Sequence, residues 1–83
     1  MMVKKQQVGV DCQFGDDGSV EVRQVLWNGR WQTVGQGRQW VDGNGRHVLI
    51  MLPGEQVREL ILQPDTLCWH LLDPRQRQKI QAV

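Results

Sequence analysis

Apolar and polar residues alternate with a period of two along most of the chain, in short segments that turn signals separate. In residues 8–14, valine, cysteine and phenylalanine alternate with glycine, aspartate and glutamine, which is typical of a strand with one buried face. Residues 20–27 repeat the alternation, but its phase slips near Arg23 and Gln24. The slip predicts a β-bulge, because one extra residue moves every following side chain to the other face.

Five turn signals divide the chain at close spacing. Asn28-Gly29 is the strongest, because a type I′ hairpin turn requires φ > 0 at both central residues and these two residue types accept it. Pro53-Gly54 suits a type II turn, with proline first and glycine second. The other signals are Gly15–Gly18, Asp42–Gly45 and Gln63–Asp65.

Two features modify the alternation in the second half of the chain. Gly35 and Gly37 interrupt the long segment 31–41, and glycines inside a strand often mark a bend or a bulge. Residues 47–52 are almost all apolar, which predicts a central strand that is covered on both faces.

The last apolar segment, residues 66–72, separates its side chains into two kinds. Leu67, Trp69 and Leu71 share one face, while Cys68 and His70 lie on the other. Three large apolar residues on one face predict that this face points into the core, with Trp69 buried there.

Together these signals predict an all-β fold, a six-stranded antiparallel meander that is twisted or closed into a small barrel. A chain of 83 residues has room for one core, so residues 1–83 are expected to form a single domain with an ordered core at about 7–72. The tail, 73–83, begins with Asp73 and Pro74, a helix-start signal, and we expect a short helix or a disordered tail. The strands are predicted near residues 7–14, 20–27, 31–41, 46–52, 56–62 and 66–72.

Composition limits the classes of function. Ten Lys and Arg face nine Asp and Glu, a net charge of +1, which does not indicate a polybasic nucleic-acid binder. No apolar run reaches the ~20 residues of a transmembrane helix, and the first residues lack the apolar stretch of a secretory signal. We therefore expect a cytoplasmic protein without a membrane segment, with both cysteines as free thiols.

The residues that could bind a metal or act in catalysis are few. The only soft ligands are Cys12, Cys68 and the two histidines, His47 and His70, and they lack the close paired spacing of a zinc site. Cys68 with His70 also has no acid nearby in sequence to orient the imidazole of a nucleophilic pair. Asp42–Gly45 lacks the further acidic ligands of a calcium loop. We therefore predict no metal, no cofactor and no enzymatic activity.

Arginine and tryptophan are interleaved in the middle of the chain, and residues 23–46 contain one acid, Asp42. Small barrels that bind single strands use aromatic platforms flanked by basic residues. The interpretation that we favour places the tryptophans in the core and the arginines in solvent. The alternative is weak binding of single-stranded nucleic acid, with the candidate residues Arg23, Arg30, Arg38, Trp40 and Arg46.

The order of residues from 27 to 72 resembles a family of small uncharacterised bacterial β-domain proteins, some of them encoded near Y-family polymerase-like proteins of DNA-damage cassettes. The motifs that carry the resemblance are a Gly-Arg turn, an Arg-x-Trp, a Glu-Leu strand and a closing Trp-x-Leu strand. The chain departs from the family at Gln32, where an aromatic residue is usual, and at Trp40-Val41, where tryptophans are paired. The resemblance implies the same fold, a link to nucleic-acid metabolism and no catalytic residues. The matching segments are Leu26–Arg30, Arg38–Val41, Val57–Leu60 and Trp69–Pro74.

Three functions follow, in order of preference. The first is a non-enzymatic interaction module that binds another protein, because exposed strand edges accept partner strands. The second is the weak nucleic-acid binding described above, and the third is an enzyme. Ionic strength separates the first two, because phosphate contacts weaken steeply with salt.

Overall fold

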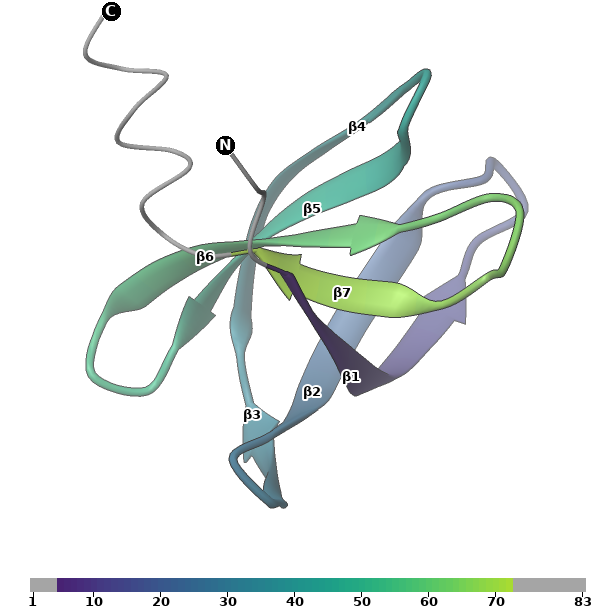
Figure 1. The fold of residues 1–83 in the computed structure, drawn as a ribbon. Coiled ribbons are helices and arrows are strands. Elements are labelled where there is room, and N and C mark those ends of the chain that lie inside the picture. The colour runs from purple at the N-terminus through teal and green to yellow at the C-terminus, as the bar shows by residue number, and fades with distance from the viewer. Residues whose placement is uncertain (1–4, 73–83) are drawn as a thin grey trace, which may run out of the picture.

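The computed structural model describes residues 5–72, and all of its regular secondary structure is β. Seven strands form one antiparallel sheet in the order β3-β2-β1-β7-β6-β5-β4 (Figure 1). The all-β prediction is confirmed, with seven strands in place of six. The strands are β1 Lys5–Phe14, β2 Val20–Trp27, β3 Arg30–Thr33, β4 Gly35–Asp42, β5 Gly45–Leu52, β6 Gln56–Leu62 and β7 Trp69–Leu72.

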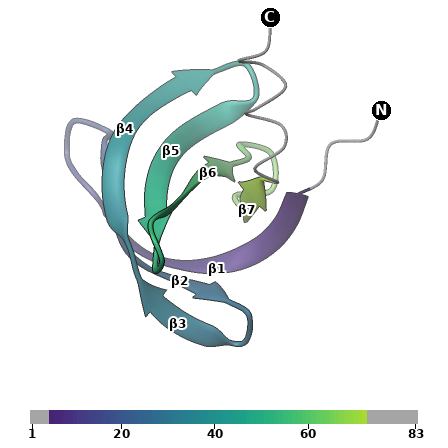
Figure 2. The same ribbon diagram turned by 90° about the vertical axis from the view of Figure 1, so that its left-hand side faces the viewer.

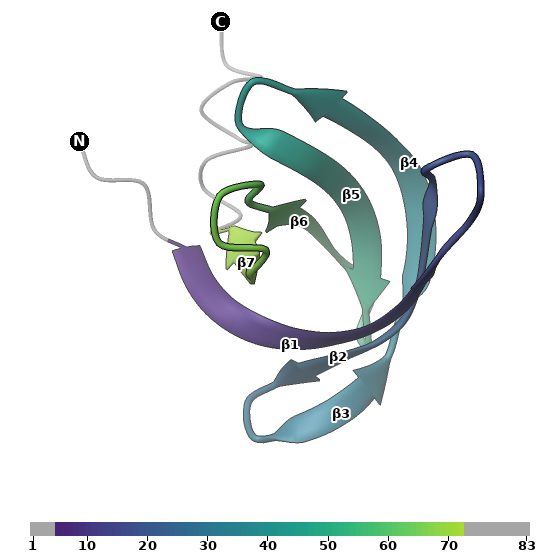
Figure 3. The same ribbon diagram turned by 90° about the vertical axis from the view of Figure 1, so that its right-hand side faces the viewer.

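The sheet curls into a half-barrel, with the first and last strands side by side at its centre (Figures 2 and 3). β1 pairs with β7 from Lys5 opposite Leu72 to Val8 opposite Trp69. β1–β2–β3 extends from this pair on one side and β7–β6–β5–β4 on the other. β3 and β4, which are consecutive in sequence, therefore lie at the two ends of the sheet.

The extra strand arises because the predicted segment 31–41 changes its neighbour at Val34. Thr33 is the last residue paired with β2, and Gly35 is the first paired with β5. Val34 is buried, and its N–H donates to the carbonyl of Arg23 at 3.2 Å. One continuous stretch of chain thus contributes to both ends of the curled sheet.

Two glutamine side chains bridge the gap between β2 and β4. Gln36 accepts from the Val22 N–H at 2.7 Å and donates to the Val20 carbonyl at 2.9 Å. Gln39 accepts from the Val20 N–H at 3.0 Å and donates to the same carbonyl at 2.9 Å. These carboxamides satisfy main-chain groups of β2 that no strand pairs, which would be costly to leave buried without a partner.

Both predicted bulges are present. In β2, Gln24 lies opposite Asp11 and Val22 opposite Cys12, so Arg23 is the extra residue, and valines on either side of it reach the same face. In β4 the register shifts between Gln36 and Gln39, across Gly37. The bulges explain how the strands keep one apolar face while the sheet bends.

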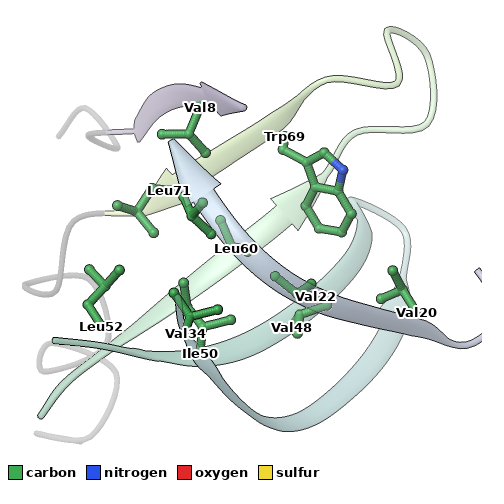
Figure 4. Close-up of a cluster of buried hydrophobic side chains, with 11 residues drawn as sticks. Val8, Val20, Val22, Val34, Val48, Ile50, Leu52, Leu60, Trp69 and Leu71 are labelled. Atoms are coloured by element: carbon green, nitrogen blue, oxygen red, sulfur yellow. The ribbon is translucent and has the colours of Figure 1, made fainter. Parts of the chain in front are cut away.

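The core lies on the inner, concave face of the sheet (Figure 4). Full burial of a valine or leucine side chain contributes roughly 1.5–3 kcal/mol, so about a dozen such residues dominate the stability of a small domain. All strands except β3 and β4 contribute, and Val34 contributes from the link between those two. The buried cluster consists of Val8, Val20, Val22, Val25, Val34, Val48, Ile50, Leu52, Leu60, Trp69 and Leu71.

The turns follow the residue chemistry. Asn28 and Gly29 have φ values of 54° and 81°, which confirms the type I′ hairpin. Gly54 has φ 83°, as the second position of a type II turn requires, and Glu55 follows with φ 61°.

Two expectations were wrong. Leu67 does not share the buried face of Trp69 and Leu71, because it lies in a turn with φ 59° and its side chain is 73% exposed. The last strand, β7, has only four residues, and buried and half-buried side chains alternate within these four alone. Residues 47–52 are not covered on both faces either, since Met51 is 45% exposed on the outer face. The tail, 73–83, lies outside the described residues.

Candidate functional site

An open apolar groove of about 290 Å³ lies on the outer, convex face of β4, β5 and β6. Strand pairing places Gly35 beside Met51 and Met51 beside Val57, so one row of residues crosses the three strands there. Met51 and Val57 are each 45% exposed, which is unusual for apolar side chains that neighbour each other in a small protein. The outer lining is formed by Gly35, Gly37, Leu49, Met51 and Val57.

The groove is open because β4 carries glycine where a strand normally carries a side chain. Neither Gly35 nor Gly37 has a left-handed backbone. A Cβ at Gly35 would come 3.9 Å from the Cβ of Met51, and one at Gly37 would come 3.6 Å from the Cβ of Leu49. Both distances are ordinary van der Waals contacts, so the fold leaves room for side chains that the sequence does not supply.

Beside the groove, His47 is held between two carboxylates on the same outer face. Its Nδ1 lies 2.5 Å from Glu59 Oε2, and its Nε2 lies 2.8 Å from Asp42 Oδ1. The imidazole is buried, and burial opposes its charge, but the hydrogen bonds and charges of Asp42 and Glu59 prevail and raise the pKa of His47. A protonated ring donates from both nitrogens, which is the form that two carboxylates favour.

A stack of three side chains leads from this histidine towards the groove. The rings of Trp40 and His47 are parallel, with an interplanar angle of 1° and centroids 4.9 Å apart. The guanidinium of Arg38 lies over the Trp40 ring, 5.0 Å from its centroid. Arg38 directly follows Gly37 and is exposed, and within residues 5–72 it forms no ion pair. The stack therefore holds a positive charge at one end of the groove.

A second apolar surface lies on the outer face at the other end of the sheet. Gly9, Leu26 and Trp31 face one another across β1, β2 and β3. A Cβ at Gly9 would come 3.3 Å from the Trp31 ring and 3.4 Å from the Leu26 Cβ, so these side chains already fill the space above the glycine. Leu26 and Trp31 remain 37% and 49% exposed.

The five residues considered for nucleic-acid binding do not lie on one surface. Arg38 and Trp40 are brought together on β4, and Arg46 donates to Gln39 Oε1 at 2.7 Å beside the β2–β4 gap. Arg23 donates to Gln13 Oε1 at 2.6 Å on the β1–β2 pair, and Arg30 begins β3.

The sequence did not single out Arg58, whose guanidinium lies over the half-buried Trp27 ring, 5.4 Å from its centroid. Strand pairing sets Arg58 opposite Ile50 of the core, so this contact is at the rim of the inner face. It resembles the stack of Arg38 on Trp40 but lies on the other side of the sheet.

The remaining reactive side chains lie apart from the groove. Cys12 and Cys68 are free, and burial with the nearby charge of Asp11 raises the pKa of Cys12, which keeps it a thiol. Cys68 Sγ lies 3.8 Å from Gln7 Nε2. Over residues 5–72, no three His, Cys, Asp or Glu side chains are grouped so that they could hold a metal ion.

Comparison with known proteins gives no match, whether with family models, with curated proteins or with solved structures. Across the described residues there is also no helix long and apolar enough to span a membrane. The outer groove was missed at the sequence level. The signal was available, because Gly35 and Gly37 stand two residues apart in a strand and opposite a segment that is apolar on both faces.

Proposed function

We propose that the chain is a non-enzymatic interaction module that binds a segment of another protein in the outer groove of β4–β6. The observation that carries this proposal is the openness of the groove at Gly35 and Gly37. Both positions accept a Cβ at ordinary contact distance, and glycine costs a strand roughly 0.5–1 kcal/mol relative to alanine. A feature that lowers stability and that the fold does not require is typical of a binding surface.

The lining of the groove indicates what it binds. Leu49, Met51 and Val57 are aliphatic, and methionine adapts to ligands of different shape. The volume is at the lower limit of small-molecule pockets, ~300 Å³, and the groove is open along the surface. Aliphatic side chains of a protein partner suit such a groove better than an enclosed small molecule.

Charge adds a second requirement for the partner. Residues 22–41 contain no acid, and two arginines within this range, Arg30 and Arg38, are exposed. A partner segment with carboxylates flanking its aliphatic residues would meet complementary charge, which favours association and orientation. We therefore expect a segment that is both aliphatic and acidic.

The test is selection from a phage-displayed library of random peptides on the immobilised protein. We expect enriched sequences with aliphatic residues and nearby Asp or Glu, and loss of their binding to Gly37→Val, in which the new side chain occupies the groove. Gly43→Val, in the β4–β5 turn at the opposite end of the hairpin from Gly35, is the matched control, because a Cβ there meets no atom within 4 Å. Enriched peptides that bind Gly37→Val as well as the parent protein would contradict the proposal.

The same material separates protein binding from nucleic-acid binding. Affinity of a selected peptide is expected to fall only modestly with salt, because apolar contacts dominate it and a few exposed ion pairs add to it. An oligothymidylate that bound with higher affinity, lost that affinity steeply with salt and was sensitive to Arg38→Gln would favour the nucleic-acid alternative.

A further inference from the structure

Within residues 5–72, the outer edge of β3 carries main-chain groups that no strand pairs, and one hydrogen bond shows which residues present them. In an antiparallel ladder, residues alternate between pairs that exchange hydrogen bonds and pairs that do not. Because the N–H of Val34 donates to the carbonyl of Arg23, the pair Gln24–Thr33 between them is of the second kind. By alternation Trp31 is of this kind too, so Trp31 and Thr33 direct their N–H and carbonyl groups away from β2.

These groups lie in line with a ladder that is already occupied further along the chain. Gly35 follows Thr33 by two residues, so its main-chain groups point to the same side of the strand, and it pairs with Met51 of β5. Leu52, which follows Met51, is the last residue of β5. The turn at Pro53 comes directly after it, and there the chain leaves the sheet. Among the described strands, none continues the ladder beside Thr33 and Trp31, since β3 ends the strand order.

The vacant ladder and the groove therefore adjoin each other. Gly35 marks their junction, because it is the first residue paired with β5 after the vacant positions and it lines the groove together with Met51. The side chain of Trp31 is on the same outer face, and it is 49% exposed. A strand that paired with Thr33 and Trp31 would carry alternate side chains over the outer face towards Met51 and Trp31.

We propose that the partner segment binds as an added β-strand on the free edge of β3, with its outward side chains in the groove and against Trp31. This binding mode rests on the proposed function of the groove and specifies the conformation of the partner. Main-chain hydrogen bonds to Trp31 and Thr33 supply affinity without regard to sequence, and the groove selects aliphatic residues. The segment is thus an extended one whose aliphatic residues are two positions apart, with carboxylates towards Arg30 or Arg38.

The short length of β3 is consistent with this role. Long exposed edges pair with other copies of the same protein, and an edge of four residues that begins with Arg30 limits such pairing. An edge of this length binds weakly alone and needs side-chain contacts beside it, which the groove provides.

The test uses a peptide selected on the parent protein and the variant Thr33→Pro. Proline at position 33 removes the outward N–H, while the hydrogen bonds between β2 and β3 at Gln32 and Val34 remain, and edge strands tolerate it. We expect about a tenfold loss of affinity, the equivalent of ~1.4 kcal/mol. Thr33→Ala keeps the N–H and is expected to bind as the parent does.

Three outcomes distinguish the binding mode from the function. Loss of binding in Thr33→Pro, together with protection of the Trp31 and Thr33 amides from hydrogen exchange when peptide is present, supports strand addition. Parent-like binding in Thr33→Pro with loss in Gly37→Val overturns strand addition and leaves the groove as the binding site. If the protein is dimeric without peptide and Thr33→Pro is monomeric, a second copy occupies the edge, and the inference about the partner is overturned.

Discussion

Gly9 and Gly37 are both glycines within strands, and both leave a gap on the outer face of the sheet, but the two gaps have different fates. Above Gly9 the ring of Trp31 and the side chain of Leu26 occupy the space where a Cβ would lie. Above Gly37 the nearest atoms belong to Leu49, at a distance that leaves room for a side chain. An aromatic neighbour that covers a glycine restores packing on that face of the sheet, whereas an uncovered glycine leaves apolar surface open for a ligand.

The same distinction applies to the two ends of the sheet. Around Gly9 the cross-strand neighbours are large and fill the outer face of β1–β3. Around Gly37 the side chains of Arg38, Trp40 and His47 are stacked on one another, and among residues 5–72 no large neighbour fills the space above the glycine. We therefore assign packing to the first region and binding to the second.

The largest expected effect is the difference in stability between variants of two tryptophans on opposite faces of the sheet, Trp69 on the inner face and Trp31 on the outer face. Trp69 is 8% exposed in the core, so Trp69→Ala is expected to lower the free energy of unfolding by about 3–5 kcal/mol. Trp31 is 49% exposed, and Trp31→Ala is expected to cost about 1 kcal/mol. Thermal and urea unfolding measure both. Equal losses would mean that the Trp31 cover contributes as much as the core does.

Valine at the two glycines is expected to change the free energy of unfolding by a smaller amount, and in opposite directions at the two positions. Gly9→Val forces Trp31 and Leu26 apart and is expected to destabilise by about 1–3 kcal/mol. Gly37→Val adds a β-branched residue over Leu49 and is expected to stabilise by about 0.5–1 kcal/mol. Urea denaturation of the two variants checks the signs.

The double variant Trp31→Ala, Gly9→Val sharpens the test. With the ring removed, the valine has room, so its cost is expected to fall well below that of the single variant. A cost that is unchanged would show that the strain at residue 9 comes from Leu26 or from the backbone and that the Trp31 cover is not its cause.

The smallest effect is the dependence of stability on pH that His47 and Asp42 contribute beside the groove. The folded state raises the pKa of His47 from 6.5, so the stabilisation is complete below pH 6.5 and is lost as the pH rises through the raised value. Hydrogen bonds from His47 and from the Asn44 N–H lower the pKa of Asp42 from 3.8, so that part is present above pH 3.8 and is lost on acidification through the lowered value.

Thermal unfolding followed between about pH 6 and pH 9 measures the histidine part. The melting temperature of the parent protein is expected to fall over this range, whereas that of His47→Gln stays nearly level. A parallel decline in both proteins would assign the dependence to other groups.

The sequence by itself determined the local structure of this protein. The period of two, the Asn28-Gly29 turn and the slip at Arg23 were sufficient to predict most of the strands, the β2–β3 hairpin and the bulge of β2 against β1, because each depends on residues close together in the chain. Leu67 shows the limit of this reasoning. It continues the apolar alternation, but a turn takes it out of the strand, and the residue pattern alone does not reveal that.

Only the tertiary structure decided which strands are neighbours and which gaps remain open. The pairing of β1 with β7, and the change of partner at Val34, depend on contacts between residues far apart in sequence. In the sequence, Gly9 and Gly37 are alike in that both are glycines within a predicted strand. What separates them is the residue across the sheet: Trp31 reaches over one, and no side chain of the described residues covers the other, because a cross-strand neighbour is set by register and curvature.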